Sequence, residues 1–118
     1  MRRHRLLVLA LVLAASVSLR AGAVYVTFEQ ITVAGTAIGF TNSKIVVGNG
    51  HQQAVFAHCR LETAEIRYTV DGTTPTSTVG EPLEPGDIVE VTGNDLLQNF
   101  RAIRTGSSGQ LNCTYTGP

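Results

Sequence analysis

The sequence has no tryptophan, only two cysteines and only three histidines among its 118 residues. The cysteines and histidines show none of the paired spacing of a zinc site, so we expect no metal and no cofactor. The aromatic side chains are three tyrosines and four phenylalanines. Such a small set weakens a carbohydrate-binding interpretation, because sugar-binding surfaces usually expose aromatic platforms. Most of the aromatic residues lie in phase with apolar neighbours, and Tyr25, Phe28 and Phe56 are the only candidates for exposure. A glycan partner therefore stays a weak alternative.

Residues 1–23 differ from the rest of the chain. A basic start at residues 2–5 precedes the unbroken apolar run Leu6–Ala15, and small residues follow at 21–23. This order is typical of a secretory signal peptide. The apolar run is shorter than the about 20 residues that span a bilayer, so we expect no stable membrane anchor. Two alternatives remain open, namely an uncleaved anchor and a miscalled start with translation beginning near Val24 or Val26.

The formal net charge of zero hides an acidic domain. Residues 24–118 contain five basic and nine acidic side chains, which gives them a net charge of −4. Binding to a nucleic acid backbone requires lysines and arginines that displace counterions. We therefore exclude nucleic acid as a partner.

Short segments rich in Val, Thr and Ile alternate with glycine-containing turns, a pattern typical of antiparallel β-domains. We expect one helical turn at 95–98, capped by Asn94 or Asp95, and a proline-rich loop or irregular edge at 73–85. Asp71 and Gly72 are the expected turn of a hairpin. Strands are expected at 24–33, 37–40, 44–47, 54–61, 65–70, 87–92, 99–104 and 110–115. The predicted fold is a small antiparallel immunoglobulin-like β-sandwich of six to eight strands over residues 24–118, after an apolar leader helix at 1–23.

The two cysteines lie in phase with apolar neighbours. Cys59 alternates with Ala57 and Leu61, and Cys113 alternates with Leu111 and Tyr115. Both side chains should therefore face the core, on separated strands. In an exported protein they are candidates for one disulfide. The alternative is two buried free thiols that act as small apolar groups.

No catalytic constellation is recognisable. Beyond the leader the only histidines are His51, in a glycine-flanked loop, and His58, in the middle of a strand with its side chain outward. Neither lies in a motif with a nucleophile, so we predict no catalytic residue and no enzyme. The carboxylates Glu62, Glu65, Glu81 and Glu84 are explained as a solvated acidic surface.

Four arginines on predicted strands form a possible interface. Arginine is favoured at protein contacts because its planar guanidinium pairs with carboxylates and stacks on rings. The alternative is a cross-strand charge network within one chain, with Glu62, Glu65 and Glu90 as partners. The four residues are Arg60, Arg67, Arg101 and Arg104.

The segment Ala64–Thr76, AEIRYTVDGTTPT, resembles the "IRYTLDGSxPT" signature of a small β-sandwich domain. That domain is appended to chitobiase and β-hexosaminidase-type enzymes and to many bacterial surface proteins. The resemblance covers 13 residues and implies a strand, an Asp-Gly turn and a proline-stiffened continuation. It implies an accessory role and no catalytic activity.

A wider stretch, from about Phe40 to Tyr115, resembles small proteins encoded among the virion structural genes of tailed phages and prophages. The similar residues are CRLE at 59–62, IRYTVDGTTPTSTVG at 66–80, PGD at 85–87 and NFRAIR at 99–104. This resemblance implies a capsid-decorating or head–tail protein, although such proteins generally have no leader.

The sequence therefore predicts a non-enzymatic structural or interaction module. Our first hypothesis is a phage virion-associated protein that contacts other virion subunits or itself and is located in the virion. The alternative is an exported bacterial β-sandwich domain, secreted or periplasmic, that binds a cell-surface glycan or protein. The first hypothesis places Arg101, Arg104 or the 73–86 loop at a subunit contact, and the second requires a disulfide and an exposed aromatic patch.

Overall fold

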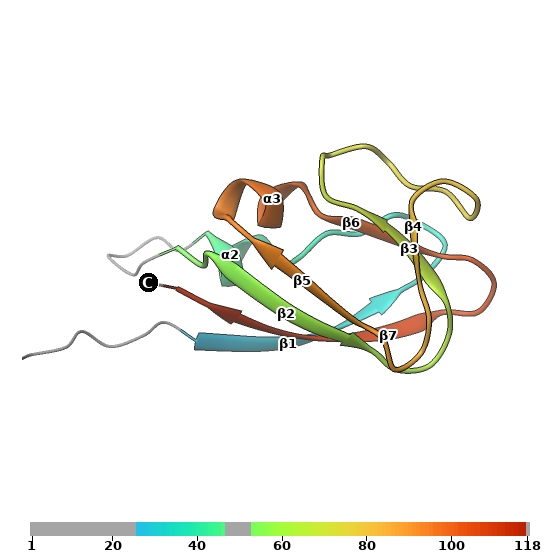
Figure 1. Cartoon of the computed structure of the whole chain (residues 1–118), viewed down its shortest axis with the longest axis horizontal. Helices are drawn as coiled ribbons and strands as arrows, with labels where there is room; N and C mark the ends of the chain where they lie inside the picture. The colour runs from blue at the N-terminus through green and yellow to red at the C-terminus, as the bar shows by residue number, and fades with distance from the viewer. Residues whose placement is uncertain (1–25, 47–52, 118) are drawn as a thin grey trace, which may run out of the picture.

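The computed structural model describes residues 26–46 and 53–117, and in these ranges the chain forms a two-layered β-sandwich (Figure 1). The four-stranded sheet has the order β1 (Val26–Val33), β7 (Gly109–Thr116), β2 (Phe56–Leu61), β5 (Ile88–Thr92). The three-stranded sheet has the order β4 (Glu81–Leu83), β3 (Ile66–Thr69), β6 (Arg101–Arg104). All pairings are antiparallel. The predicted all-β sandwich of six to eight strands is confirmed, while the expected leader at 1–23 lies outside the described residues.

The core forms where strand alternation places apolar side chains on facing sides of the two sheets. On β7 the side chains of Leu111, Cys113 and Tyr115 are fully buried, as the sequence pattern predicts. Ile66 on β3 is fully buried as well, and Tyr68 packs against the same core. The inward phase of each strand, read from alternation alone, is therefore confirmed for these strands.

An aromatic cluster fills one part of the core. The rings of Phe40 and Phe100 stack with centroids 4.1 Å apart, and Tyr115 meets Phe40 edge-on at 5.1 Å. Tyr68 stacks on the Phe100 ring at 5.7 Å. Such ring pairs stabilise a fold beyond the area that they bury. The cluster joins the segment after β1 to both sheets, and it uses four of the few aromatic side chains of the chain.

Two short helices, α2 (Asn42–Ile45) and α3 (Asn94–Asn99), lie against each other beside the strands (Figure 1). The predicted strand at 44–47 is wrong over its described part, because the Thr41–Ser43 turn continues into one helical turn that buries Ile45. The predicted strand at 37–40 is reduced to a single bridge between Ile38 and Ala102. Local turn propensity and the burial of Ile45 override the weak strand pattern here.

The predicted helical turn at 95–98 is confirmed as α3, but its predicted cap is wrong. Gly93 takes the N-cap position, and no side chain caps the helix. The amide of Asn94 instead donates to the carbonyl oxygens of Ile45 at 3.0 Å and Ala54 at 2.7 Å. Asn94 thus ties α3 to α2 and to the segment before β2, where the Ile45 carbonyl oxygen also accepts from the backbone N–H of Ala54 at 3.0 Å.

The two cysteines form a disulfide within the four-stranded sheet. Cys59 on β2 and Cys113 on β7 are register partners with Cα atoms 4.1 Å apart, and both are fully buried. The prediction that they lie on separated strands is wrong, because β2 and β7 are neighbours in the same sheet. The disulfide therefore joins adjacent strands inside one layer and leaves the packing between layers to apolar side chains.

Candidate functional site

The first candidate is an ion pair between a histidine and an acid, the only such pair within residues 26–46 and 53–117. His58 Nδ1 lies 2.9 Å from Glu90 Oε2, on neighbouring strands β2 and β5. Both side chains are exposed on a sheet surface, and no hydroxyl or thiol nucleophile is hydrogen-bonded to His58 in the described part of the chain. No group of three potential metal ligands occurs among the residues that the structure describes. His58 and Glu90 therefore form a cross-strand pair and lack the nucleophile that catalysis requires.

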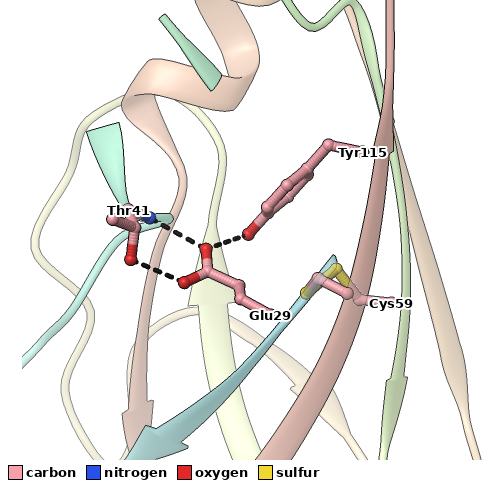
Figure 2. Close-up of a disulfide and its surroundings, with 5 residues drawn as sticks. Glu29, Thr41, Cys59 and Tyr115 are labelled. Carbon is pink, nitrogen blue, oxygen red and sulfur yellow. Dashed lines mark hydrogen bonds between the residues drawn. A yellow bond between two sulfur atoms is a disulfide. The ribbon is translucent and has the colours of Figure 1, made fainter. Parts of the chain in front are cut away.

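A second cluster surrounds the carboxylate of Glu29 (Figure 2). The phenol of Tyr115 donates a hydrogen bond to Glu29, and Thr41 donates from its backbone N–H at 3.0 Å and from its hydroxyl at 2.5 Å. Burial and the Glu29 carboxylate together raise the pKa of Tyr115 far above its ordinary value, so this phenol stays neutral. The three donors fix the segment after β1 onto the four-stranded sheet. We interpret this cluster as structural.

A third cluster is a pair of carboxyl groups that sequence order does not bring together. A hydrogen bond from the Thr105 hydroxyl, at 2.8 Å, and one with Glu84 lower the pKa of Glu65. The pKa of Glu84 is raised, first by this hydrogen bond with Glu65 and then by desolvation and by the negative charges of Glu65 and Asp87. In the sequence Glu65 is close to Glu62 and Glu84 is close to Glu81, whereas the fold sets Glu65 beside Glu84. Glu84 is exposed and Glu65 is half-buried, so the pair is a titrating feature at the surface.

The outward surface of the four-stranded sheet, here called the outer sheet face, is the most extensive candidate. Alternate residues of each strand point to this side. They are Val26, Phe28, Gln30 and Thr32 on β1; Gln110, Asn112, Thr114 and Thr116 on β7; Phe56, His58 and Arg60 on β2; and Ile88, Glu90 and Thr92 on β5.

One end of the outer sheet face is apolar. Val26 and Phe28 each expose 57% of their surface, and Phe56 is half-buried two strands away. Between the two phenylalanines lie Thr114, the register partner of Phe28, and Thr116, the register partner of Val26 and Phe56. Adjacent strands lie about 4.8 Å apart and the two phenylalanines are offset by two residues along β7, so their side chains start about 12 Å apart on a continuous surface. We call these five residues the phenylalanine patch.

The polar part of the outer sheet face is mostly hydrogen-bonded within itself. Gln30 donates to Asn112 at 2.9 Å, and Thr32 donates to Gln110 at 3.2 Å. Arg60 is exposed and has no hydrogen-bond or ion-pair partner among the described residues. The groups left for an external partner therefore include the apolar patch and, away from it, the guanidinium of Arg60 with its exposed register partner Ile88. Aromatic and arginine side chains are the types that dominate binding energy at protein interfaces.

The other three arginines are engaged inside the chain. Arg67 donates from Nη1 to the carbonyl oxygen of Gly80 at 2.8 Å. Arg101 donates to two carbonyl oxygens of the segment before β6, and Arg104 donates to Ser108 at 3.4 Å. Within residues 26–46 and 53–117 these three arginines form no ion-pair contact with the expected glutamates, because their guanidiniums bond to carbonyl and hydroxyl oxygens; the charge of Arg67 still contributes to the lowered pKa of Glu65. Of the four arginines, Arg60 alone is on the outer sheet face.

The segment around Asp71 and Gly72 turns the chain as predicted, but it does not join two paired strands directly. Gly72 has a φ of 89°, and Asp71 Oδ1 accepts from the backbone N–H of Thr73 at 3.0 Å. Residues 70–80 then separate β3 from its partner β4, where Pro82 lies at the edge of the sheet. The expected irregular edge within 73–85 is confirmed.

Sequence reasoning found part of the outer sheet face. It proposed Tyr25, Phe28 and Phe56 as exposed aromatics. Phe28 is exposed and Phe56 is half-buried, while Tyr25 lies outside the described residues. It missed Val26 and Ile88, which expose 57% and 44% of their surface. The alternation that places Ile31 and Val33 inward also places Val26 outward, so the signal was present in the first strand.

Comparison with known proteins bears on the family of the chain. No described helix has the length and apolar character needed to span a membrane. No curated protein and no solved structure matches the chain. Residues 47–112, more than half of the sequence, match the family described as the Chitobiase/beta-hexosaminidase C-terminal domain. The match extends well beyond the 13 residues that suggested it, whereas the resemblance to virion proteins stays a prediction. The chain belongs to the chitobiase/beta-hexosaminidase C-terminal domain family.

Proposed function

We propose that this chain is an exported, non-enzymatic binding module that attaches to a protein partner through its outer sheet face. The family supports the non-enzymatic part, because the C-terminal domain of chitobiase is an accessory and non-catalytic domain. The protein partner is the specific part of the proposal, and it rests on the surface chemistry of the four-stranded sheet.

The phenylalanine patch is the observation that supports this proposal most strongly. Val26 and Phe28 are each more than half exposed, and their neighbours Thr114 and Thr116 add methyl groups without charge. The patch is bordered by polar side chains that are paired with one another, Gln30 with Asn112 and His58 with Glu90, and Arg60 lies beyond His58 on the same face of β2. An apolar centre with a polar rim is the usual anatomy of a protein–protein contact. The patch has no tyrosine or tryptophan among the described residues, which makes a glycan a poorer fit.

Two features support export. The buried disulfide between Cys59 and Cys113 is of a kind that forms and persists in oxidising compartments outside the cytosol. The apolar segment at 6–15, with its basic start, is typical of a secretory leader. Together these two features support a secreted or periplasmic location.

A virion-associated role is the second candidate. It uses the same surface, since capsid decoration also depends on protein–protein contacts, and it differs in the partner and in the absence of a leader. The intact mass of the native protein separates the two. A chain that begins near Val24 without methionine and gains two hydrogens on reduction supports export. A chain that begins with methionine near residue 24 or 26 and is unchanged by reduction supports the virion role.

The binding surface itself is tested with a patch variant, Phe28→Ser/Phe56→Ser, and a control on the same face, Thr32→Ser/Thr92→Ser. Each immobilised protein is exposed to extracellular proteins and, separately, to deproteinised cell-wall polysaccharide from the organism that encodes it. We expect the wild type and the control to retain one or more proteins and no polysaccharide. The patch variant should bind these proteins at least about tenfold more weakly, because truncating a central aromatic residue usually costs more than 1 kcal/mol. Equal binding by patch variant and control, or retention of polysaccharide alone, would refute the proposal.

A further inference from the structure

A pocket on the three-stranded sheet lies apart from the outer sheet face. It has a volume of about 250 Å³ and is lined by Tyr68, Thr69, Val70, Asp71, Gly80 and Glu81. Tyr68 and Glu81 are the register pair nearest to the point where β3 and β4 separate. Residues 70–80 leave the sheet there, and the pocket fills the space between the diverging segments.

The floor of this pocket is held in place by the core. Tyr68 and Val70 pack against the buried cluster, and the Tyr68 ring is stacked on Phe100 with an interplanar angle of 20°. Burial and then the charge of Glu81 raise the pKa of Tyr68, so its hydroxyl stays neutral. The pocket thus has a fixed aromatic and aliphatic wall that an incoming side chain can contact.

The rim of the pocket is negatively charged. Asp71 accepts from the backbone N–H of Thr73 at 3.0 Å, which lowers the pKa of Asp71 and keeps it ionised. Glu81 is exposed on the opposite strand. None of the lining residues is basic. Arg67, their neighbour in sequence, points to the other side of β3 by alternation, and it donates to the Gly80 carbonyl oxygen.

We propose that this pocket binds a primary ammonium group on an apolar stem, as in a lysine side chain presented by a partner protein. Asp71 and Glu81 come from different segments, so they can accept hydrogen bonds from one ammonium along two directions. The methylene stem of a lysine packs along apolar surface while its charge stays near water, and Tyr68 and Val70 supply that surface. A compact ammonium with three rotatable donors fits two separate carboxylates better than a planar guanidinium does.

Charge also separates this ligand from the alternatives. An anionic ligand would meet two carboxylates and no cation in the pocket. A neutral sugar would gain hydrogen bonds but no charge attraction. The pocket is formed by β3, β4 and the loop between them, so it can be occupied whether or not the phenylalanine patch binds a protein.

The test is an NMR titration of the isotope-labelled full chain at low salt, with Nα-acetyl-lysine N-methylamide as the probe. The matched neutral probe is Nα-acetyl-norleucine N-methylamide, which keeps an apolar stem and lacks the ammonium. Methyl glucoside tests the sugar alternative. We expect the lysine probe to shift the amide signals of Val70, Asp71, Gly80 and Glu81 with millimolar affinity, and the other two probes to leave them unchanged.

The variant Asp71→Asn/Glu81→Gln removes both charges, and the asparagine side chain that replaces Asp71 retains an oxygen to accept from Thr73. The control variant Glu62→Gln/Asp95→Asn removes two exposed charges elsewhere. We expect the pocket variant to bind the lysine probe about fivefold more weakly or worse, from two exposed ion pairs, and the control to bind it like the wild type. Equal weakening in both variants, equal binding of the norleucine probe, or binding of methyl glucoside alone would overturn the proposal. None of these outcomes involves the phenylalanine patch, so the two proposals fail independently.

Discussion

Reduction of the Cys59–Cys113 disulfide should remove a large part of the stability of the domain. The two cysteines are 54 residues apart in sequence. In the chain-entropy model, a cross-link that closes a loop of this length stabilises the folded state by about 4 kcal/mol at 25 °C. Domains of this size are typically stable by only about 5–15 kcal/mol. The reduced protein should therefore fold only marginally.

The assay is urea unfolding followed by far-ultraviolet circular dichroism, since the chain has no tryptophan to report by fluorescence. The oxidised protein is compared with protein that was reduced while unfolded and then refolded under reductant. A loss of about 4 kcal/mol corresponds to a fall in melting temperature of about 20 °C, at about 4–8 °C per kcal/mol for a domain of under 100 residues. The variant Cys59→Ala/Cys113→Ala should be similarly destabilised and should not respond to reductant.

Burial adds a kinetic expectation. Both cysteines are fully buried, so reductant should reach the disulfide only when the sheet opens, and native reduction should accelerate with urea. The reasoning is refuted if reduction changes the free energy of unfolding by less than about 1 kcal/mol. It is also refuted if protein isolated from its native compartment carries two free thiols, the alternative that the sequence left open.

Three further changes test individual contacts. Tyr115→Phe should lower the free energy of unfolding by about 1–3 kcal/mol, because it leaves the half-buried Glu29 carboxylate without its phenol donor. A double-mutant cycle with Glu29→Gln measures the coupling between the two side chains, and additive effects of the two substitutions would contradict the prediction. At pH values well above 4.5, Glu84→Gln should raise the melting temperature, and below pH 4.5 it should leave the melting temperature unchanged. The reason is that the raised pKa of Glu84 makes its ionisation destabilise the fold as pH rises. A difference between variant and wild type that stays constant across the pH series would show that the carboxyl pair is not the cause. Gly39→Ala should destabilise the domain, because a Cβ there lies 2.7 Å from a guanidinium nitrogen and 2.8 Å from a backbone oxygen, whereas Gly106→Ala meets nothing and should be neutral in the same thermal assay.

Much of the strand content could be predicted because alternation is a local property. Residues Ile66, Tyr68 and Val70 alternate with polar neighbours, and their inward phase is correct. The predicted inward or outward direction of a side chain is wrong where a contact between distant segments determines it. In the expected strand 54–61, alternation places Val55 on the inward face with Cys59 and Ala54 on the outward face. Ala54 is nevertheless buried and Val55 exposed, because β2 begins only at Phe56 and the preceding residues turn toward α2 and α3.

For the proposed binding surfaces, too, local alternation was predictable from the sequence and the contacts between distant segments were not. Alternation identified Phe28 and Phe56 as candidates for exposure, but no local pattern shows that β1 and β2 lie on either side of β7. The Glu65–Glu84 pair and the pocket at Tyr68 arise from strand pairing across the 70–80 segment, which separates their members in sequence. The hydrogen-bond partners of the arginines were the least predictable feature, because Arg67 and Arg101 bond to backbone carbonyl oxygens, which any residue supplies.

The sequence by itself determined the all-β class, the inward phase of the main strands, the acidic character of residues 24–118 and the possibility of a disulfide, because each depends on residue type and on the two-residue period of a strand. Only the tertiary structure decided that Cys59 and Cys113 are partners in one sheet, that Phe28 and Phe56 lie on one face on either side of β7, and that Asp71 and Glu81 border one pocket. These arrangements depend on strand order and register. Strand order and register are set by how the whole core packs, and no single segment encodes them.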